Sequence, residues 1–151
     1  MPDYSQDWLC RQIVEHSQDA IIFADEGGVI RLWNAGAAAI FGFSETEALG
    51  QSLNFIIPEN LRARHEEGYR RVMATGVTRY GRDLLAVPGL HKNGTRLSLE
   101  FTIVLVRGKG GALLGTAAII REVTARWQRE QDLRRRLAAL EEAARERGTI
   151  P

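Results

Sequence analysis

The alternation of apolar and polar residues within residues 96–106 is the feature that most constrains the fold of this chain. Apolar side chains occupy every second position there: Leu97, Leu99, Phe101, Ile103 and Leu105. Successive side chains of a strand point to opposite faces, so this spacing predicts a strand with one buried and one wet face. Because a half-buried strand needs neighbours, we expect it to belong to a sheet.

Four further segments are strand candidates. Residues 20–24 and 29–33 are short β-rich runs, and the Asp-Glu-Gly-Gly sequence between them is a hairpin signal. Residues 80–87 and 113–123 flank the alternating segment, and Asn-Gly and Gly-Gly pairs separate the three. The sequence therefore predicts two strands, an intervening region, and three more strands.

Helical patterns fill the intervening region and precede the first strand. Asn34 is a residue type that caps helices, and it opens a stretch of short helices. A longer helix is predicted over residues 58–75, because a proline suits its first turn and Gly76 suits its end. The apolar spacing in residues 4–17 predicts a short amphipathic helix. This order of elements indicates an α+β fold.

From Thr124 the chain is rich in Arg, Glu, Ala and Leu, which predicts a helical tail. Four of its residues follow the 4-3-4 spacing of a coiled-coil seam: Leu133, Leu137, Leu140 and Ala144. Only about two heptads follow this pattern, so a dimer seam and an amphipathic helix within one chain both remain open. We expect three parts: an N-terminal helix in residues 1–18, a core in residues 19–123 and the tail in residues 124–151.

The composition limits the classes of function. The 151 residues suit one domain, and a formal net charge of +1 provides no extended positive field for nucleic acid. Cys10 is the sole cysteine, which excludes an internal disulfide and a cysteine-based metal site made by one chain. No run approaches the roughly 18 apolar residues of a membrane span. With no recognisable catalytic motif either, we expect a cytoplasmic protein that is not an enzyme and binds neither nucleic acid nor membrane.

Several short motifs lie at the joints of this pattern: W-N-A-G-A at residues 33–37, F-G-F-S at 41–44, I-P-E at 57–59, K-N-G at 92–94 and R-E-V-T at 121–124. Together they resemble the PAS domain family of the S-box type, over roughly residues 10–126. The resemblance implies a five-stranded antiparallel sheet with helices inserted after the second strand, flanked by N- and C-terminal helices. It implies no single ligand, because PAS domains bind haem, flavins, small acids or nothing.

The long helix carries the candidate binding residues. Helical spacing places five of them on one face: Leu61, His65, Gly68, Tyr69 and Val72. A core-facing imidazole needs a hydrogen-bond acceptor or a metal, because a buried polar group without a partner costs about 1–3 kcal/mol. His65 is therefore the first candidate for a functional residue.

The segment R-H-E-E-G-Y-R-R at residues 64–71 resembles the haem-binding PAS oxygen sensors of the FixL type. The resemblance implies that His65 is the axial iron ligand of a b-type haem and that Arg71 lies near a haem propionate. Where those sensors hold oxygen with an arginine, this chain has Leu85. With Ile103 and Leu105, Leu85 would make the distal side apolar, so we expect a sensor of redox state or of a diatomic gas, with carbon monoxide or nitric oxide favoured over oxygen.

Two alternatives to haem remain open: another small-molecule ligand, or a packed core in which His65 is structural. A flavin-cysteine adduct is disfavoured, because residues 51–60 contain no cysteine. In a sensor, we expect the signal to leave the last strand through Glu122 and Thr124 to the tail. The alternative role is a ligand-free interaction module. For either role we expect a homodimer through the terminal helices and an output protein or domain acting in trans.

Overall fold

The computed structural model describes residues 1–2, 4–78 and 84–148. The first half of the chain forms α1 (Gln6–His16), β1 (Ala20–Asp25), β2 (Ile30–Trp33), α2 (Ala35–Phe41), α3 (Glu45–Ala48) and the 3-10 helix η1 (Leu53–Ile56). The second half forms the 3-10 helix η2 (Glu59–Leu61), α4 (Arg62–Thr75), β3 (Leu85–Leu90), β4 (Arg96–Arg107), β5 (Leu113–Glu122) and α5 (Thr124–Glu146). The predicted order of two strands, helices and three strands is confirmed.

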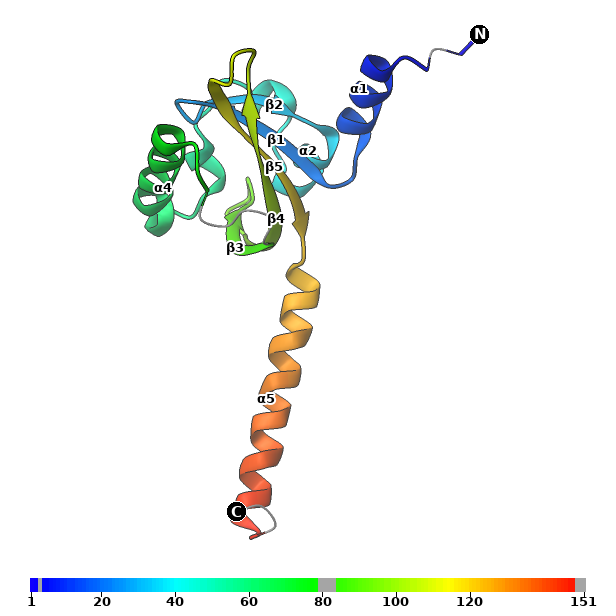
Figure 1. Cartoon of the computed structure of the whole chain (residues 1–151). Helices are drawn as coiled ribbons and strands as arrows, with labels where there is room; N and C mark the ends of the chain where they lie inside the picture. Colours follow the sequence, from blue (N-terminus) through cyan, green and yellow to red (C-terminus); the bar gives the residue numbers. More distant parts are fainter. Residues whose placement is uncertain (3, 79–83, 149–151) are drawn as a thin grey trace.

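The five strands form one antiparallel sheet in the order β2-β1-β5-β4-β3. Figure 1 shows α4 on the opposite side of the domain from α1, and α5 extending away from the sheet. This arrangement confirms the predicted α+β fold, with helices inserted after the second strand.

The strand register places the alternating residues of β4 on the face that carries the core. Phe101 lies opposite Ile120 of β5 and Leu85 of β3, and Ile120 is buried. Ile103 and Leu105 follow on the same face at two-residue intervals. On the other face of the same strand, Val104 is half exposed. The predicted two-sided strand is confirmed.

The long helix differs from its prediction in the first turn. Pro58 has an extended backbone, and the Leu61 amide donates to the Pro58 carbonyl oxygen, so residues 59–61 form a 3-10 turn. The α-helix starts at Arg62 and stops where Gly76 takes a positive φ of 69°. Proline therefore opens the helical segment, but through a tighter turn than expected.

The third strand is displaced along the chain from its prediction over residues 80–87. It spans Leu85–Leu90, and residues 80–83 lie outside the described residues. The hairpin with β4 sets this position, because the His91 amide donates to the Thr95 carbonyl oxygen. Pro88 is tolerated within the strand because β3 lies at the edge of the sheet.

The side chain of Asn34 joins α1 to the sheet. Its Oδ1 accepts hydrogen bonds from the amides of Ala37 (2.9 Å) and Ile21 (2.8 Å), and the first of these caps α2 as predicted. Its Nδ2 donates to the carbonyl oxygens of Val14 in α1 (2.8 Å) and of Asp19 (3.0 Å). Asn34 is only 5% exposed, so these bonds replace water around all its polar groups.

The tail forms a single helix, α5, none of whose residues is buried. The seam residues Leu133, Leu137 and Leu140 are all more than half exposed. The structure therefore does not pack this seam on the domain of its own chain (Figure 1). A coiled coil with a second chain remains a prediction.

Candidate functional site

A half-open pocket of about 360 Å³ lies beside α4. Residues 26–28 of the β1–β2 turn, residues 52–54 around the start of η1, and one face of α4 line it. Its volume falls within the range of about 300–1,000 Å³ that small-ligand sites occupy. It is the candidate functional site, because it contains the histidine singled out from the sequence.

His65 presents its ring to this pocket from the second turn of α4. Burial lowers the pKa of the imidazole, and the charge of Glu66 opposes the shift only in part. The ring centroid lies 6.0 Å from that of Tyr69, one turn along the helix. The lowered pKa favours the neutral imidazole, which is the form that binds a metal through a ring nitrogen.

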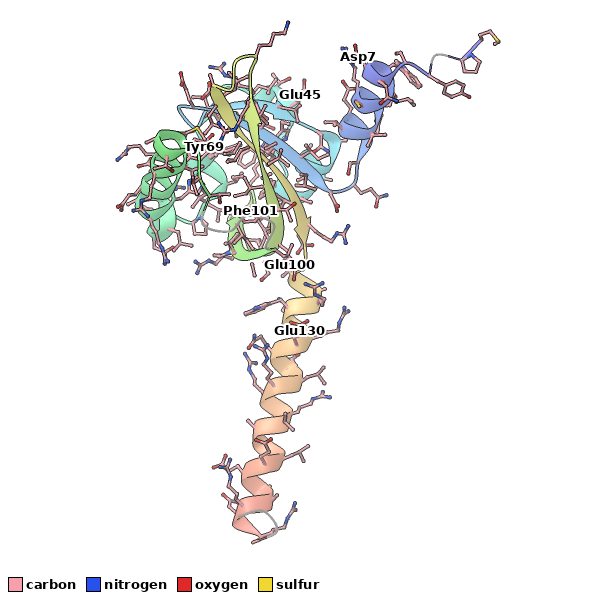
Figure 2. The ribbon with its side chains drawn as sticks, viewed as in Figure 1. Asp7, Glu45, Tyr69, Glu100, Phe101 and Glu130 are labelled. Carbon is pink, nitrogen blue, oxygen red and sulfur yellow. The ribbon has the colours of Figure 1, made fainter. Side chains whose placement is uncertain are left out.

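Tyr69 attaches α4 to the sheet. Its hydroxyl lies 2.6 Å from the carbonyl oxygen of Asp25 and 3.0 Å from that of Ala24, both at the end of β1, and donates to them. Burial raises the pKa of the phenol, while hydrogen bonds involving Thr116 of β5 lower it. Tyr69, labelled in Figure 2, therefore positions the helix that carries His65.

The other predicted site residues lie in three places. Leu61 and Val72 are half-buried around α4, and neither is among the described lining residues of the pocket. Arg71 is exposed, and its Nη2 donates to the Glu67 carboxylate at 3.1 Å. Three predicted residues lie on the same face of the sheet, which is the face that carries the core: Leu85, Ile103 and Leu105. The pocket beside His65 thus brings together His65 and Tyr69, but neither Arg71 nor these three sheet residues are among its described lining residues.

Two residues of the pocket escaped the sequence analysis. The amide Nδ2 of Asn54 in η1 donates to the Glu66 carboxylate, which ties η1 to α4 next to His65. The residues are 12 apart in sequence and belong to no common periodic pattern. No local signal predicts their contact, because it depends on how the chain folds back after η2.

The predicted signal exit is held to β4 by a compact set of hydrogen bonds. Glu122 accepts from the Thr124 amide at 2.6 Å. The Thr124 hydroxyl accepts from the Ser98 amide at 3.0 Å, and the Ser98 carbonyl accepts from the Val123 amide at 2.8 Å. These bonds attach the first residues of α5 to β4.

His65 supplies one nitrogen donor to a pocket whose described lining also includes polar or charged side chains: Glu26, Ser52, Asn54, Glu66 and Arg70. Among the described residues, no group of three or more His, Cys, Asp and Glu could hold a metal ion. A haem brings four iron ligands of its own and needs only an axial one from the protein. A Cβ at Gly68 would meet nothing within 4 Å, but Gly68 is not among the described lining residues of the pocket. Of the described lining residues, His65 carries the imidazole that could serve as one axial ligand.

Within the described part of the chain, we find no helix with the length and hydropathy to span a membrane.

Two solved structures share this fold. The PAS domain of a Colwellia psychrerythraea protein matches with a TM-score of 0.70 and 22% identity, over 80% of this chain and 99% of that one. An RNA-binding light-oxygen-voltage receptor matches with a TM-score of 0.72 and 20% identity, over 91% of this chain and 39% of that one. At these identities the likeness concerns the fold alone.

Two relatives resemble the chain in sequence. The sensor protein FixL of Bradyrhizobium diazoefficiens is 34% identical over 96 residues, which are 62% of this chain and 18% of that protein. An uncharacterised protein of Azorhizobium caulinodans is 34% identical over 117 residues, 77% of this chain and 16% of that protein. The chain thus spans less than a fifth of either relative. The family model of the PAS fold matches residues 14–128, and the chain therefore belongs to the PAS family.

Proposed function

We propose that this PAS domain is a sensor that binds a b-type haem through His65 and responds to a diatomic gas or to a change of redox state. The observation that carries the proposal is the half-buried imidazole of His65 on a helix that borders a pocket. Burial lowers the pKa of this imidazole and so favours the neutral form that binds iron. The similarity to the sensor protein FixL supports it. Bound haem would supply an iron centre that responds to gas and to electrons.

In this proposal each of the predicted site residues has its own role in binding the haem. His65 holds the group from α4, and Tyr69 holds α4 to the end of β1. Arg71 would leave its exposed pair with Glu67, which costs little because exposed pairs are weak, and contact a propionate. Leu85, Ile103 and Leu105 lie outside the described lining of the pocket, and a haem that extended from His65 to their face of the sheet would have an apolar distal side that favours carbon monoxide or nitric oxide.

The signal would travel from α4 to α5 through the sheet. Tyr69 bonds to the end of β1, and β1 pairs with β5 along its whole length. The end of β5 leads through Glu122 and Thr124 into α5. A displacement of α4 on ligand binding would therefore change the angle at which α5 leaves the domain.

An absorption spectrum of the purified protein reconstituted with haem tests the proposal. We expect an intense Soret band that shifts on reduction and on addition of carbon monoxide, and that is lost in His65→Ala. The matched control is His16→Ala, which removes an exposed histidine on α1. A specific band that survives in His65→Ala, or no specific band in the wild type, contradicts the proposal.

A second candidate is a ligand-free module that acts by forming a homodimer through its terminal helices. The exposed apolar residues of these helices favour it: Trp8, Ile13, Leu133, Leu137 and Leu140. Sedimentation equilibrium should then show a dimer without haem that dissociates in Leu137→Asp. A wild-type monomer at all concentrations contradicts this candidate. In either function, we propose that the output is a protein or domain acting in trans.

A further inference from the structure

A row of four charged side chains crosses the outer face of the sheet between the two terminal helices. Asp19 precedes β1, Arg121 lies on β5, Glu100 lies on β4, and Arg126 lies in the first turn of α5. Arg121 and Glu100 are direct partners across the β4–β5 ladder, and they alternate with core-facing neighbours such as Ile120. From the C-terminal end of α1 to the N-terminal end of α5, the charges therefore alternate in the order negative, positive, negative, positive.

The end pairs of this charge row are joined by specific contacts. The Arg121 guanidinium donates to the Asp19 carboxylate through two nitrogens, with Nε–Oδ1 and Nη2–Oδ2 distances of 3.2 Å and 3.0 Å. Arg126 donates through Nη2 to the Glu100 carboxylate. Two parallel bonds fix the orientation of a guanidinium as well as its position. Figure 2 labels Glu100 close to the point where α5 leaves the sheet.

Both ends of the charge row are tied to a terminal helix. At one end, the buried amide of Asn34 donates to the carbonyl oxygens of Asp19 and of Val14 in α1. Gly36 supports this contact, because a Cβ there would lie 2.2 Å from the Asp19 carbonyl oxygen. At the other end, Arg126 is itself part of α5. A displacement of α1 therefore moves the carboxylate that holds Arg121.

The charge row consists of two ion pairs, which are neighbours because Arg121 and Glu100 are partners across the β4–β5 ladder. An isolated ion pair at a protein surface contributes little, but pairs with bidentate geometry and pairs linked in a network contribute more. Asp19 and Glu100 are the more sheltered members, with side chains 31% and 20% exposed. Solvent still reaches all four groups, so salt will weaken the row.

We propose that this charge row couples α1 directly to α5, so that the domain passes a displacement of its N-terminal helix to its C-terminal helix along the outer face of the sheet. This input differs from the one proposed for the His65 pocket. The pocket lies beside α4, and none of the four charged residues is among its described lining residues. The coupling therefore does not depend on whether His65 binds haem.

Distance measurements between spin labels on the two helices test the coupling. One label occupies the native Cys10, which is exposed on α1, and the other occupies Gln128→Cys on α5. Excess unlabelled protein suppresses distances between chains. We expect a narrow distribution in the wild type and one about twice as wide or wider in Arg121→Gln, because the link to Asp19 is lost. The charge exchange Asp19→Arg with Arg121→Asp should restore a narrow distribution.

The matched control is Arg31→Gln. It removes an exposed arginine–aspartate pair at 2.8 Å between β2 and the end of β1, outside the charge row, and should leave the width unchanged. Salt provides a further test: about 1 M salt shortens the Debye length to about 3 Å and should widen the distribution more in the wild type than in Arg121→Gln, which keeps only the pair between Glu100 and Arg126. Equal widths in the wild type and Arg121→Gln at low salt overturn the proposal.

A repeat in the His65→Ala background separates this inference from the proposed function. The coupling predicts the same narrow distribution there, whether or not the haem spectrum is lost. A wide distribution in His65→Ala, with the charge row intact, would place the coupling in the pocket and overturn the proposal.

Discussion

The two sides of this domain are held in different ways. On the side of β1, β2 and α2, side chains pack into a dry core in which Ile30 and Phe41 are 0% exposed and Trp33 is 2% exposed. On the other side, α4 has no buried residue. Hydrogen bonds attach that side instead: Tyr69 to β1, Asn54 to Glu66, and Arg62 to the Ile57 carbonyl oxygen at 3.0 Å.

This difference indicates that the two sides of the domain suit different roles. Apolar packing is stable and does not depend on direction, so the β1–β2–α2 side can serve as the fixed frame. An element held by a few partly exposed hydrogen bonds opens at lower free energy than the core does. The helix that carries His65 is therefore the part of the domain best suited to respond to a ligand.

The largest effect should come from Trp33→Ala on the packed side. Its side chain contacts Phe41 and Phe55 at ring-centroid distances of 5.6 and 5.7 Å, and truncation should lower the free energy of unfolding by about 3–5 kcal/mol. The matched change on the other side, Val72→Ala, should cost about 1 kcal/mol, because its side chain is only half-buried. Urea denaturation measures both. Equal losses in the free energy of unfolding would contradict the difference between the two sides.

Asn34→Ala should rank second. It leaves the buried Ala37 amide and part-buried groups of α1 and β1 without their partner and should cost about 2–3 kcal/mol in urea denaturation. The control is Asn93→Ala in the exposed β3–β4 turn, where Oδ1 accepts only from the Thr95 amide, and it should cost about 0.5 kcal/mol. A small loss in Asn34→Ala would mean that α1 is not fixed to the frame.

Tyr69→Phe should have a smaller effect on stability but a local effect on α4. Loss of the hydroxyl should cost about 1 kcal/mol and should speed hydrogen exchange in α4 more than in β1. Tyr4→Phe, at an exposed position before α1, is the control and should change neither quantity. If exchange in β1 and α4 rises equally, the hydroxyl supports the whole fold rather than the helix.

The smallest effect should be a dependence of stability on pH that comes from His65 in the haem-free protein. Its folded pKa is lowered by burial, so the unfolded chain binds a proton first as pH falls below the ordinary value of 6.5. Protonation then favours the unfolded chain, and stability should decrease from about pH 6.5 towards the lower folded pKa. His65→Gln should remove this part of the pH dependence. An unchanged profile in His65→Gln would show that the imidazole is not desolvated.

The fold could be predicted from the sequence because its signals are local. The alternation centred on Phe101 and the glycine-rich turns define β4 and its neighbours without knowledge of distant residues. The bounds of β3 are harder to predict from the sequence, because they depend on its pairing with β4. This pairing includes Pro88, which lies opposite Ser98. The predicted start of the α-helix at Pro58 is wrong, because residues 59–61 form a 3-10 turn after this proline.

For the site, the sequence predicts only the part that the spacing along a single helix determines. Helical spacing alone places His65 and Tyr69 on the same side of α4. The hydrogen bond from Tyr69 to Asp25 and the contact between Asn54 and Glu66 join segments that meet only in the folded chain. Similarly, Asn34 could be identified as a helix cap, but its hydrogen bond to Val14 spans 20 residues and has no sequence signal.

Native-state hydrogen exchange as a function of urea concentration tests the central claim most directly, which is that α4 moves on a fixed frame. We predict that amides of α4 exchange through local openings with little dependence on urea. Amides of β1 should exchange only by global unfolding, with the full dependence on urea. If the amides of α4 show the same free energy and urea dependence as those of β1, the helix belongs to the frame and the account is contradicted.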